Sequence, residues 1–324
     1  MTHIAKITAL AAFAGTTLPL AAQTELSIAH VLGETSSYQI ASEKLAELVE
    51  ERTDGEVIIN VFSQGALGGE LRLIQGLRTG TVDLAFVATA SLENTVPEVR
   101  VFSLPYLFDS KEQAYERMAS EPGQEMLGVF DDYDMIGLGW GAIYERSLPS
   151  MIPITSVEEM NGAKVRVIEA PGWVNTYEAM GSQATPLAYG ELFLALQNRI
   201  VDAAELAPDQ TVGDGFAEVI TDYTLTRVHQ LPSLMLGSAT LSARLTDEQM
   251  TIIREAAPEA LAAGIAAHDE ATDEALDLMA ERGITIHEPD LEPFMEQART
   301  AWPGLMEEIP GGEDLVQTLV GSSD

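Results

Sequence analysis

The stretch Met160-Asn-Gly-Ala-Lys-Val-Arg-Val167 sets a permanent cation, Arg166, between two valines in a segment typical of a buried β-strand. A capping-box pattern, Ser156-Val-Glu-Glu159, predicts a helix start just upstream. A sheet covered by helices leaves little water for a guanidinium, and an unpaired charge there would cost several kcal/mol. An anion must therefore meet Arg166, and the planar guanidinium suits a carboxylate. Whether that anion belongs to the protein or to a ligand stays open at this point.

Outward from this strand, short strands alternate with amphipathic helices along the chain. Strands are expected at residues 25–31, 57–62, 82–89, 135–140, 164–168, 184–187 and 201–204, and helices at residues 39–52, 69–79, from 110 onward, 172–180 and 190–198. This alternation predicts an α/β fold with a mostly parallel sheet. A long helical region is expected from the capping box Thr246-Asp-Glu-Gln249 toward Arg282, with Pro258 as a kink or break. The tail from Leu291 is expected to be helical and amphipathic.

Two segments of the chain echo each other. Residues 74–83 and residues 193–202 align in step, and each is a helix that closes onto a short strand beginning Val-Asp. The echo predicts two lobes built to one plan, with a crevice between them, which is where α/β folds bind ligands. No Gly-rich or Pro-rich linker separates the halves, so we expect the chain to cross between the lobes more than once.

Composition is that of a globular protein with a sizeable core, because 46% of the 324 residues are hydrophobic and the mean hydropathy is +0.07. The N-terminus is typical of a secretory signal peptide, with Lys6 before a short apolar core at residues 7–14 and small residues ending at Ala22. We therefore expect residues 1–22 to be a signal peptide and the mature protein to reside in the periplasm. No later apolar run reaches the ~18 residues that would span a bilayer.

Several function classes are disfavoured. The chain has no cysteine, which excludes a disulfide scaffold, thiol catalysis and thiolate zinc sites. Its net charge of −34 disfavours nucleic acid and anionic membrane surfaces as partners. His268, Asp269 and Asp273, and the acids at 131–134, lack the spacing of metal ligands and are interpreted as solvated surface. Because no nucleophile or phosphate-binding pattern occurs either, we expect no metal, no cofactor and no catalytic centre.

Cationic and aromatic side chains beside the predicted strands are the candidate ligand groups. Arg146 and Arg166 are each either half of a structural ion pair or a ligand anchor, and Glu145 is a candidate partner for Arg146. Trp173 and Tyr189 begin helices directly after strands, at the ends where crevices form. Each of these aromatic residues is either part of the core or a ligand contact.

Five strings of residues, in order along the chain, resemble the substrate-binding proteins of TRAP (tripartite ATP-independent periplasmic) transporters, of the dicarboxylate-binding type. They are Gly65-Ala-Leu-Gly-Gly-Glu70, Gly76-Leu-Arg-Thr-Gly-Thr-Val-Asp83, Leu104-Pro-Tyr-Leu-Phe108, Met160-Asn-Gly-Ala-Lys-Val-Arg-Val167 and Leu194-Ala-Leu-Gln-Asn-Arg-Ile-Val-Asp-Ala-Ala-Glu205. The resemblance implies a two-lobed α/β periplasmic binding protein with a hinge and a long helix bracing both lobes. Residues 23–145 would form mainly lobe I and residues 146–230 mainly lobe II. Residues 231–324 would supply a strand returning between the lobes, the long helix and the C-terminal helices.

The resemblance also implies a function and roles for particular residues. The cleft would close on a small organic acid and deliver it to small and large integral membrane subunits. The family's carboxylate-clamping arginine falls on Arg166, its frequent second arginine on Arg146, and its stacking aromatic residue on Tyr189. These three residues are therefore the expected ligand contacts.

Departures from the family pattern bear on the ligand. The position at which many relatives carry a ligand-contacting Asn is Leu206 here, and positions that are charged in some relatives are Ala88 and Ser91, so the sialic-acid type is not expected. Ser91, Glu205 and Asp209 could hydrogen-bond ligand hydroxyls, which favours a sugar acid such as a hexuronate over a four-carbon dicarboxylate. The alternatives are that dicarboxylate, a keto acid or a sulfonate as ligand and, from another class, a secreted α/β enzyme acting on an acidic metabolite.

Overall fold

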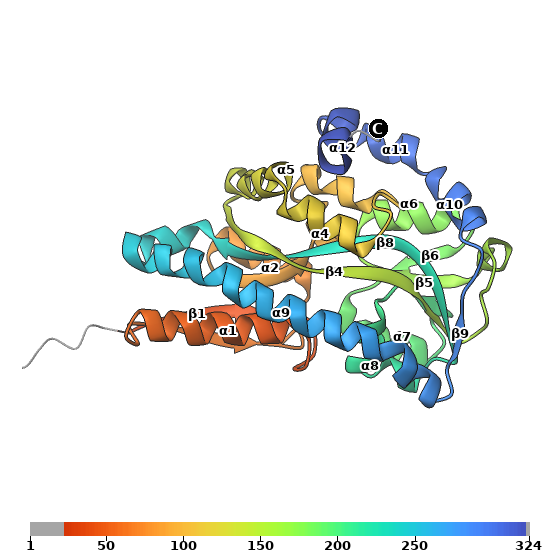
Figure 1. Cartoon of the computed structure of the whole chain (residues 1–324), viewed down its shortest axis with the longest axis horizontal. Helices are drawn as coiled ribbons and strands as arrows, with labels where there is room; N and C mark the ends of the chain where they lie inside the picture. Colours follow the sequence, from red (N-terminus) through yellow and green to blue (C-terminus); the bar gives the residue numbers. More distant parts are fainter. Residues whose placement is uncertain (1–22, 322–324) are drawn as a thin grey trace, which may run out of the picture.

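A nine-stranded mixed sheet forms the centre of the computed structural model, which describes residues 23–321 (Figure 1). Its strand order is β2-β1-β3-β8-β4-β7-β5-β6, with β9 paired to β8. The strands are β1 (Thr24–Ala29), β2 (Val57–Phe62), β3 (Leu84–Ala88), β4 (Met135–Ser150), β5 (Lys164–Val167), β6 (Gln183–Pro186), β7 (Ala203–Ala204), β8 (Asp222–Ser238) and β9 (Thr285–His287).

Helices and short 3-10 turns surround the sheet. The helices are α1 (Ser37–Arg52), α2 (Glu70–Thr79), α3 (Thr89–Leu92), α4 (Lys111–Ala119), α5 (Glu121–Glu125), α6 (Pro171–Ala179), α7 (Leu192–Gln197), α8 (Pro208–Gly213), α9 (Asp247–Glu281), α10 (Glu292–Arg299), α11 (Trp302–Glu307) and α12 (Gly312–Val320). The 3-10 turns are η1 (Pro97–Ser103), η2 (Met126–Tyr133), η3 (Val157–Met160), η4 (Tyr189–Glu191), η5 (Phe216–Glu218) and η6 (Ala239–Ala243). The expected alternation of strands and helices, and the helical tail, are confirmed.

The expectation of a mostly parallel sheet is wrong in the middle of the sheet. β1 is parallel to β2 and β3, and β5 is parallel to β6 and β7, but β8 is antiparallel to β3 and β4, and β4 is antiparallel to β7. β4 and β8 contain 16 and 17 residues. Only the start of β4 was expected as a strand, because Gly139, Gly141 and the charged pair Glu145 and Arg146 interrupt its apolar pattern.

The two long strands β4 and β8 connect two lobes (Figure 1). Lobe I contains β1, β2 and β3 with α1 and α2, and lobe II contains β5, β6 and β7 with α6, α7 and α8. The expected bracing helix is α9, which packs against α1 of lobe I and α8 of lobe II. The lobe boundaries expected at 145/146 and 230/231 fall inside β4 and β8 and stay predictions.

The bracing helix α9 begins as expected and continues further than expected. Its capping box is confirmed, because the backbone N–H of Gln249 donates to the Thr246 hydroxyl at 3.2 Å and the backbone N–H of Thr246 donates to the side-chain oxygen of Gln249 at 3.1 Å. Pro258 lies inside the 35-residue helix, so the proline does not end it. One rigid element therefore reaches both lobes.

The capping box expected at Ser156 is wrong. Val157–Met160 forms only the 3-10 turn η3, and the Ser156 side chain makes no cap hydrogen bond. The Glu159 carboxylate accepts hydrogen bonds chiefly from the backbone N–H and hydroxyl of Thr155, at 2.6 and 2.9 Å. Local side-chain-to-backbone bonds of this kind compete with regular helix formation.

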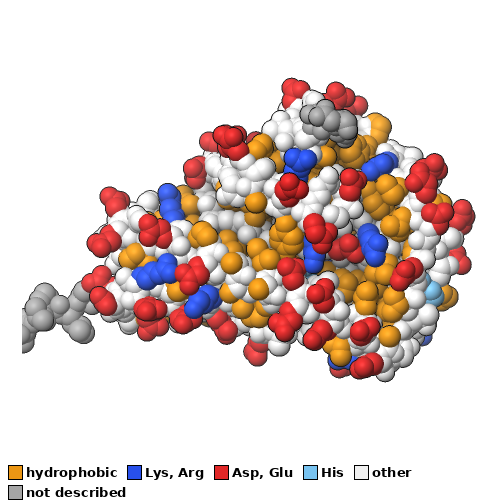
Figure 2. Space-filling view, in the orientation of Figure 1, with side chains coloured by type: hydrophobic (Ala, Val, Ile, Leu, Met, Phe, Trp, Pro, Cys, Tyr) orange, Lys and Arg blue, Asp and Glu red, His pale blue; other side chains and the backbone are white. Residues whose placement is uncertain are grey.

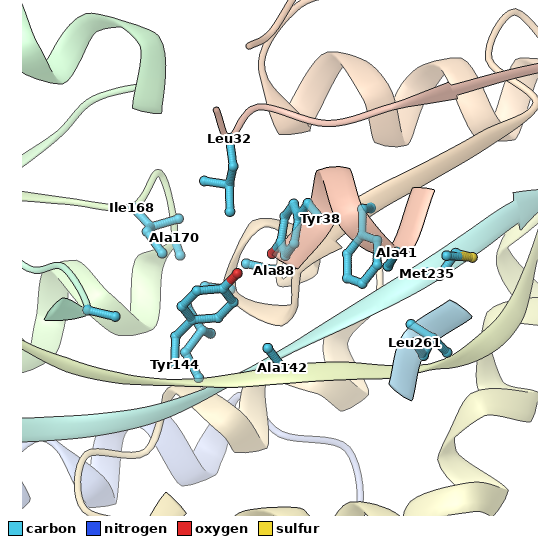
Figure 3. Packing of buried hydrophobic residues seen from close by; sticks show 14 of the residues in the cluster. Leu32, Tyr38, Ala41, Ala88, Ala142, Tyr144, Ile168, Ala170, Met235 and Leu261 are labelled. Carbon is cyan, nitrogen blue, oxygen red and sulfur yellow. The ribbon is translucent and has the colours of Figure 1, made fainter. Parts of the chain in front are cut away.

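Apolar side chains of both lobes share one core. The cluster in Figure 3 joins Leu32 and Tyr38 of lobe I with Ile168 of lobe II, and Leu261 of α9 belongs to the same cluster. The Tyr38 ring stacks on Phe86 with 4.2 Å between the ring centres. The lobes are therefore held together by packing as well as by the strands that cross between them.

Acidic side chains are spread over the face of the molecule shown in Figure 2, in keeping with the net charge of −34. Among the helices of residues 23–321, none combines the length and the apolar character needed to cross a bilayer. The expected signal peptide, residues 1–22, lies outside the described residues.

Gly264 allows α9 to approach α1 closely. A Cβ at this position would lie 2.6 Å from the Ser37 backbone oxygen and 2.9 Å from the Ala41 methyl group. We expect Gly264→Ala to lower the free energy of unfolding by about 1–3 kcal/mol, because one helix must shift. Gly304→Ala in α11 is the matched control, since its Cβ would meet no atom of residues 23–321 within 4 Å. Urea unfolding of both variants is the measurement, and equal stability of the two would contradict the close contact.

Candidate functional site

A pocket lies between the lobes, at the carboxyl ends of the parallel strands. The segments after β1 and β3, with α1 and α2, form its lobe I wall, and the segments after β5 and β6, with α8, form its lobe II wall. β4 and β8 contribute the remainder. Such a position is where α/β folds bind ligands. The polar side chains that the site uses are Glu70, Ser91, Arg146, Arg166, Tyr189 and Gln210.

Arg166 projects from β5 into this pocket and is only 2% exposed. Its Nη1 donates to the Glu205 carboxylate at 3.0 Å, while its Nε and Nη2 donate to the Leu187 backbone carbonyl at 3.0 and 2.8 Å. The anion that meets Arg166 is thus the protein's own. A guanidinium has five N–H donors, so two of them have no acceptor among residues 23–321. These two donors remain for a group that enters the pocket.

Arg146 lies on β4 and is more fully paired. Its Nε donates to the Glu205 carboxylate at 2.7 Å, its Nη2 to the Glu205 backbone carbonyl at 2.6 Å, and its Nη1 to the side-chain oxygen of Gln210. The expected pairing with Glu145 is wrong, because neighbouring residues of a strand point to opposite faces of the sheet. Glu145 instead pairs with Arg227, at 3.1 Å.

Glu205 is fully buried and contacts both arginines. Because Glu205 carries a single negative charge, one of the two positive charges is left without a salt-bridge partner among residues 23–321. Such a charge is costly in a low-dielectric interior, and a second anion would offset the cost. Glu205 does not line the pocket. Its carboxylate positions Arg146 and Arg166, and the ligand contact expected for it stays a prediction.

Glu70, the first residue of α2, places a carboxyl group in the lobe I wall. It accepts hydrogen bonds from the Ala88 N–H at 3.1 Å and from the Ser91 hydroxyl. Burial raises the pKa of Glu70 to about 7. Near neutral pH the group can therefore donate as well as accept. Sequence reasoning did not single out Glu70, although this residue ends the string Gly65-Ala-Leu-Gly-Gly-Glu70 that carries part of the resemblance.

Aromatic side chains complete the pocket. The Tyr189 hydroxyl donates to Asp214 at 2.5 Å, and the Tyr189 ring meets Phe216 edge-on with 5.5 Å between the ring centres. Tyr38 and Tyr144 also line the pocket, and Figure 3 shows them side by side. Neither of the last two was a sequence candidate, since an aromatic residue in an amphipathic pattern is usually part of the core.

Besides Glu205, two further expected ligand contacts, Trp173 and Asp209, do not line the pocket. Trp173 is fully buried and stacks on His229 with 4.0 Å between the ring centres, and the Arg146 guanidinium lies 6.0 Å from the centre of its ring. Trp173 thus makes a cation–π contact with Arg146. Asp209 pairs with His268 at 2.8 Å. The interpretation of His268 as solvated surface is wrong, because this side chain is 1% exposed.

Most of the chain matches a known protein family. The model of DctP, described as bacterial extracellular solute-binding protein, family 7, matches residues 28–308. The chain belongs to this family. The family and its structural neighbours are binding proteins rather than enzymes, and the resemblance to TRAP solute-binding proteins is confirmed.

Solved structures of similar solute-binding proteins share the two-lobed fold. The sugar acid binding protein DctPAm from Advenella mimigardefordensis, in complex with galactonate, is 26% identical with a TM-score of 0.88, and the match covers 92% of this chain and 97% of that one. A TRAP periplasmic solute binding protein from Sulfitobacter sp. NAS-14.1 with bound β-D-galacturonate is 27% identical with a TM-score of 0.89, over 92% and 100% of the two chains. The C4-dicarboxylate-binding periplasmic protein DctP of Shewanella loihica is 25% identical over 99% of this chain and 97% of its own length.

We expect Glu205→Gln to lower the free energy of unfolding by about 3–5 kcal/mol, because the variant leaves two buried guanidiniums without an anion. Glu145→Gln is the matched control. It removes a carboxylate from the Arg227 pair, in which the arginine side chain is 49% exposed, and should cost at most about 1 kcal/mol. Urea unfolding compares the two variants, and similar losses would refute the central role of Glu205.

The raised pKa of Glu70 predicts how stability depends on pH. The pKa is about 7 in the folded protein and 4.5 ordinarily, so between these values the folded state binds more protons than the unfolded chain. The contribution to stability is complete below pH 4.5 and is lost as the pH rises through 7. Glu93, whose pKa burial also raises to about 7, adds to the same fall.

Glu70→Gln and Glu93→Gln should therefore each flatten the decline of the melting temperature across this pH window, and the double variant should flatten it further. Thermal unfolding at a series of pH values is the measurement. An unchanged slope in Glu70→Gln would show that this carboxyl group has an ordinary pKa.

Proposed function

We propose that this protein captures a hydroxylated monocarboxylic acid, such as a hexuronate or an aldonate, in the periplasm and delivers it to the small and large membrane subunits of a TRAP transporter. The observation that carries the proposal is the positive charge that Glu205 leaves without a salt-bridge partner at Arg146 and Arg166, together with the two N–H donors of Arg166 that have no acceptor among residues 23–321. A ligand carboxylate would supply the missing anion and accept both donors.

The opposite wall of the pocket favours a ligand whose second end carries hydroxyl groups rather than another carboxylate. Glu70 faces Arg166 across the pocket, and a ligand carboxylate close to Glu70 would repel it when it is ionised. A ligand hydroxyl can accept from the protonated Glu70 or donate to the ionised one. Galactonate and galacturonate in the two similar solved structures agree with this chemistry. The C4-dicarboxylate that the name of the Shewanella relative gives is the alternative ligand.

Capture would follow from lobe closure. An open form admits the acid, Arg166 binds the carboxylate, and Tyr189 covers the ligand as the lobes close. The ligand shifts the equilibrium toward the closed form by its higher affinity for that form. No catalytic step is part of the proposal, because binding and release suffice for delivery.

Ligand identity and the arginine role can be tested together. We expect a thermal-shift screen against hexuronates, aldonates, C4-dicarboxylates, keto acids and sulfonates to give its largest stabilisation with a hydroxylated monocarboxylate. Arg166→Lys keeps the positive charge but loses the planar donor pair, so affinity for that acid should fall about 100-fold, or ~2.7 kcal/mol.

Arg227→Lys is the matched control, because Arg227 does not line the pocket, and it should leave affinity unchanged. Isothermal titration calorimetry gives the dissociation constants. Unchanged affinity in Arg166→Lys would refute the anchor, and a dominant response to a C4-dicarboxylate would replace the sugar acid as ligand.

A further inference from the structure

Asp214 connects the two lobes through a single carboxylate. It caps the C-terminal end of α8 in lobe II, and its Oδ1 accepts the backbone N–H of Gly33 in lobe I at 2.9 Å. Its Oδ2 accepts the Tyr189 hydroxyl at 2.5 Å. Gly33 and Asp214 lie 181 residues apart in sequence, so the contact depends on how the lobes meet.

No side chain fits at position 33 while the Asp214 carboxylate is in this position. A Cβ at residue 33 would lie 2.3 Å from Oδ1 of Asp214 and 3.5 Å from its Cγ. Among residues 23–321, the atoms that a methyl group would meet within 4 Å are those of this carboxyl group, and the backbone of Gly33 is not left-handed. Alanine at this position would thus displace the Asp214 carboxylate and leave its other described neighbours in place.

Tyr189 connects the same carboxylate to the pocket. Its ring lines the ligand pocket while its hydroxyl is held by Asp214. Asp214 is half-buried, and burial raises the pKa of its carboxyl group. A second carboxylate, Glu93, also bridges the lobes by accepting the Gly172 N–H at 2.9 Å, but its side-chain hydrogen-bond partners among residues 23–321, Ser103 and Gly172, do not line the pocket.

We propose that Asp214 is a positioning residue that latches the closed lobes: one carboxylate holds the Gly33 N–H and the Tyr189 hydroxyl together only when the lobes meet. The latch rests on the proposed capture of an acid between the lobes, and it adds a reason for slow release. A ligand that holds the Tyr189 ring in place favours the latch, and the latch in turn holds the ring over the ligand. Opening must break the Asp214–Gly33 hydrogen bond, which is the one of the two that crosses between the lobes, before the ligand can leave.

A double-mutant cycle on Gly33 and Asp214 tests the latch. Gly33→Ala and Asp214→Ala should each raise the dissociation rate constant of D-galacturonate, D-glucuronate or D-galactonate about tenfold, with little change in the association rate constant. Combining the two should give no further increase, because the methyl group added at position 33 then has no carboxylate to displace. Asp214→Asn keeps an acceptor for Gly33 and a polar partner for Tyr189, so it should restore most of the slow release.

Tyr189→Phe, which removes the hydroxyl and keeps the ring, should also speed release. Stopped-flow fluorescence provides the rate constants, and circular dichroism checks that each variant folds. The latch would be overturned if the increase in the dissociation rate constant of the double variant were the product of the two single increases. An unchanged dissociation rate constant in Asp214→Ala would overturn it as well. If Asp214→Ala and Asp214→Asn lowered the association rate constant equally, the variants would indicate a general defect of the pocket, and the latch would also be overturned.

A ligand-free measurement separates failure of the latch from failure of the proposed function. The chain has no cysteine, so Gln75→Cys on α2 and Gln197→Cys on α7 provide one label site in each lobe. Both positions are exposed. If none of the three acids binds the unmodified protein, the proposed ligand class fails, and spin-label distances then decide the latch alone. Asp214→Ala should lengthen the mean distance between the labels, and an unchanged distance distribution would overturn the latch.

Discussion

One buried carboxylate, that of Glu205, balances only half of the positive charge of Arg146 and Arg166. It offers one oxygen to each guanidinium and its own backbone carbonyl to Arg146, so both cations are oriented before any ligand arrives. Orientation by the protein reduces the ordering that binding must bring about, which favours affinity. The same imbalance makes the interior receptive to one further anion. The structure therefore combines a stable fold with an incomplete ion-pair cluster.

The fold places this ion-pair cluster in the pocket between the two lobes. β4 carries Arg146 and runs between the lobes, while Arg166 lies on β5 within lobe II. Glu70 and Tyr38 face them from lobe I. Because the walls of the pocket belong to different lobes, a change in the angle between the lobes changes the pocket. α9, which packs on both lobes, restricts that change to few directions.

The charge on the surface is opposite to the charge in the pocket. The chain carries 51 acidic and 17 basic residues, and acidic side chains are spread over the visible face in Figure 2. Salt screens charges at the surface beyond about 10 Å, whereas the buried guanidiniums are screened much less. An acidic solute is therefore repelled weakly at a distance and attracted strongly once it reaches Arg166. Salty surroundings would favour this arrangement further.

Local patterns along the chain were enough to predict most helices, most strands and the position of Arg166 in a buried strand, whereas Arg146 and Tyr189 were assigned to the pocket through the resemblance to the family. They failed where partners come from far along the chain. Glu205 lies 59 residues from Arg146 and 39 from Arg166, and Asp214 lies 181 residues from Gly33. Periodicity reports which face of an element is buried, but not which side chain of another element meets it there. The antiparallel pairing of β4 and β8, and with it the choice of each buried charge's partner, came only from the three-dimensional packing of the two lobes.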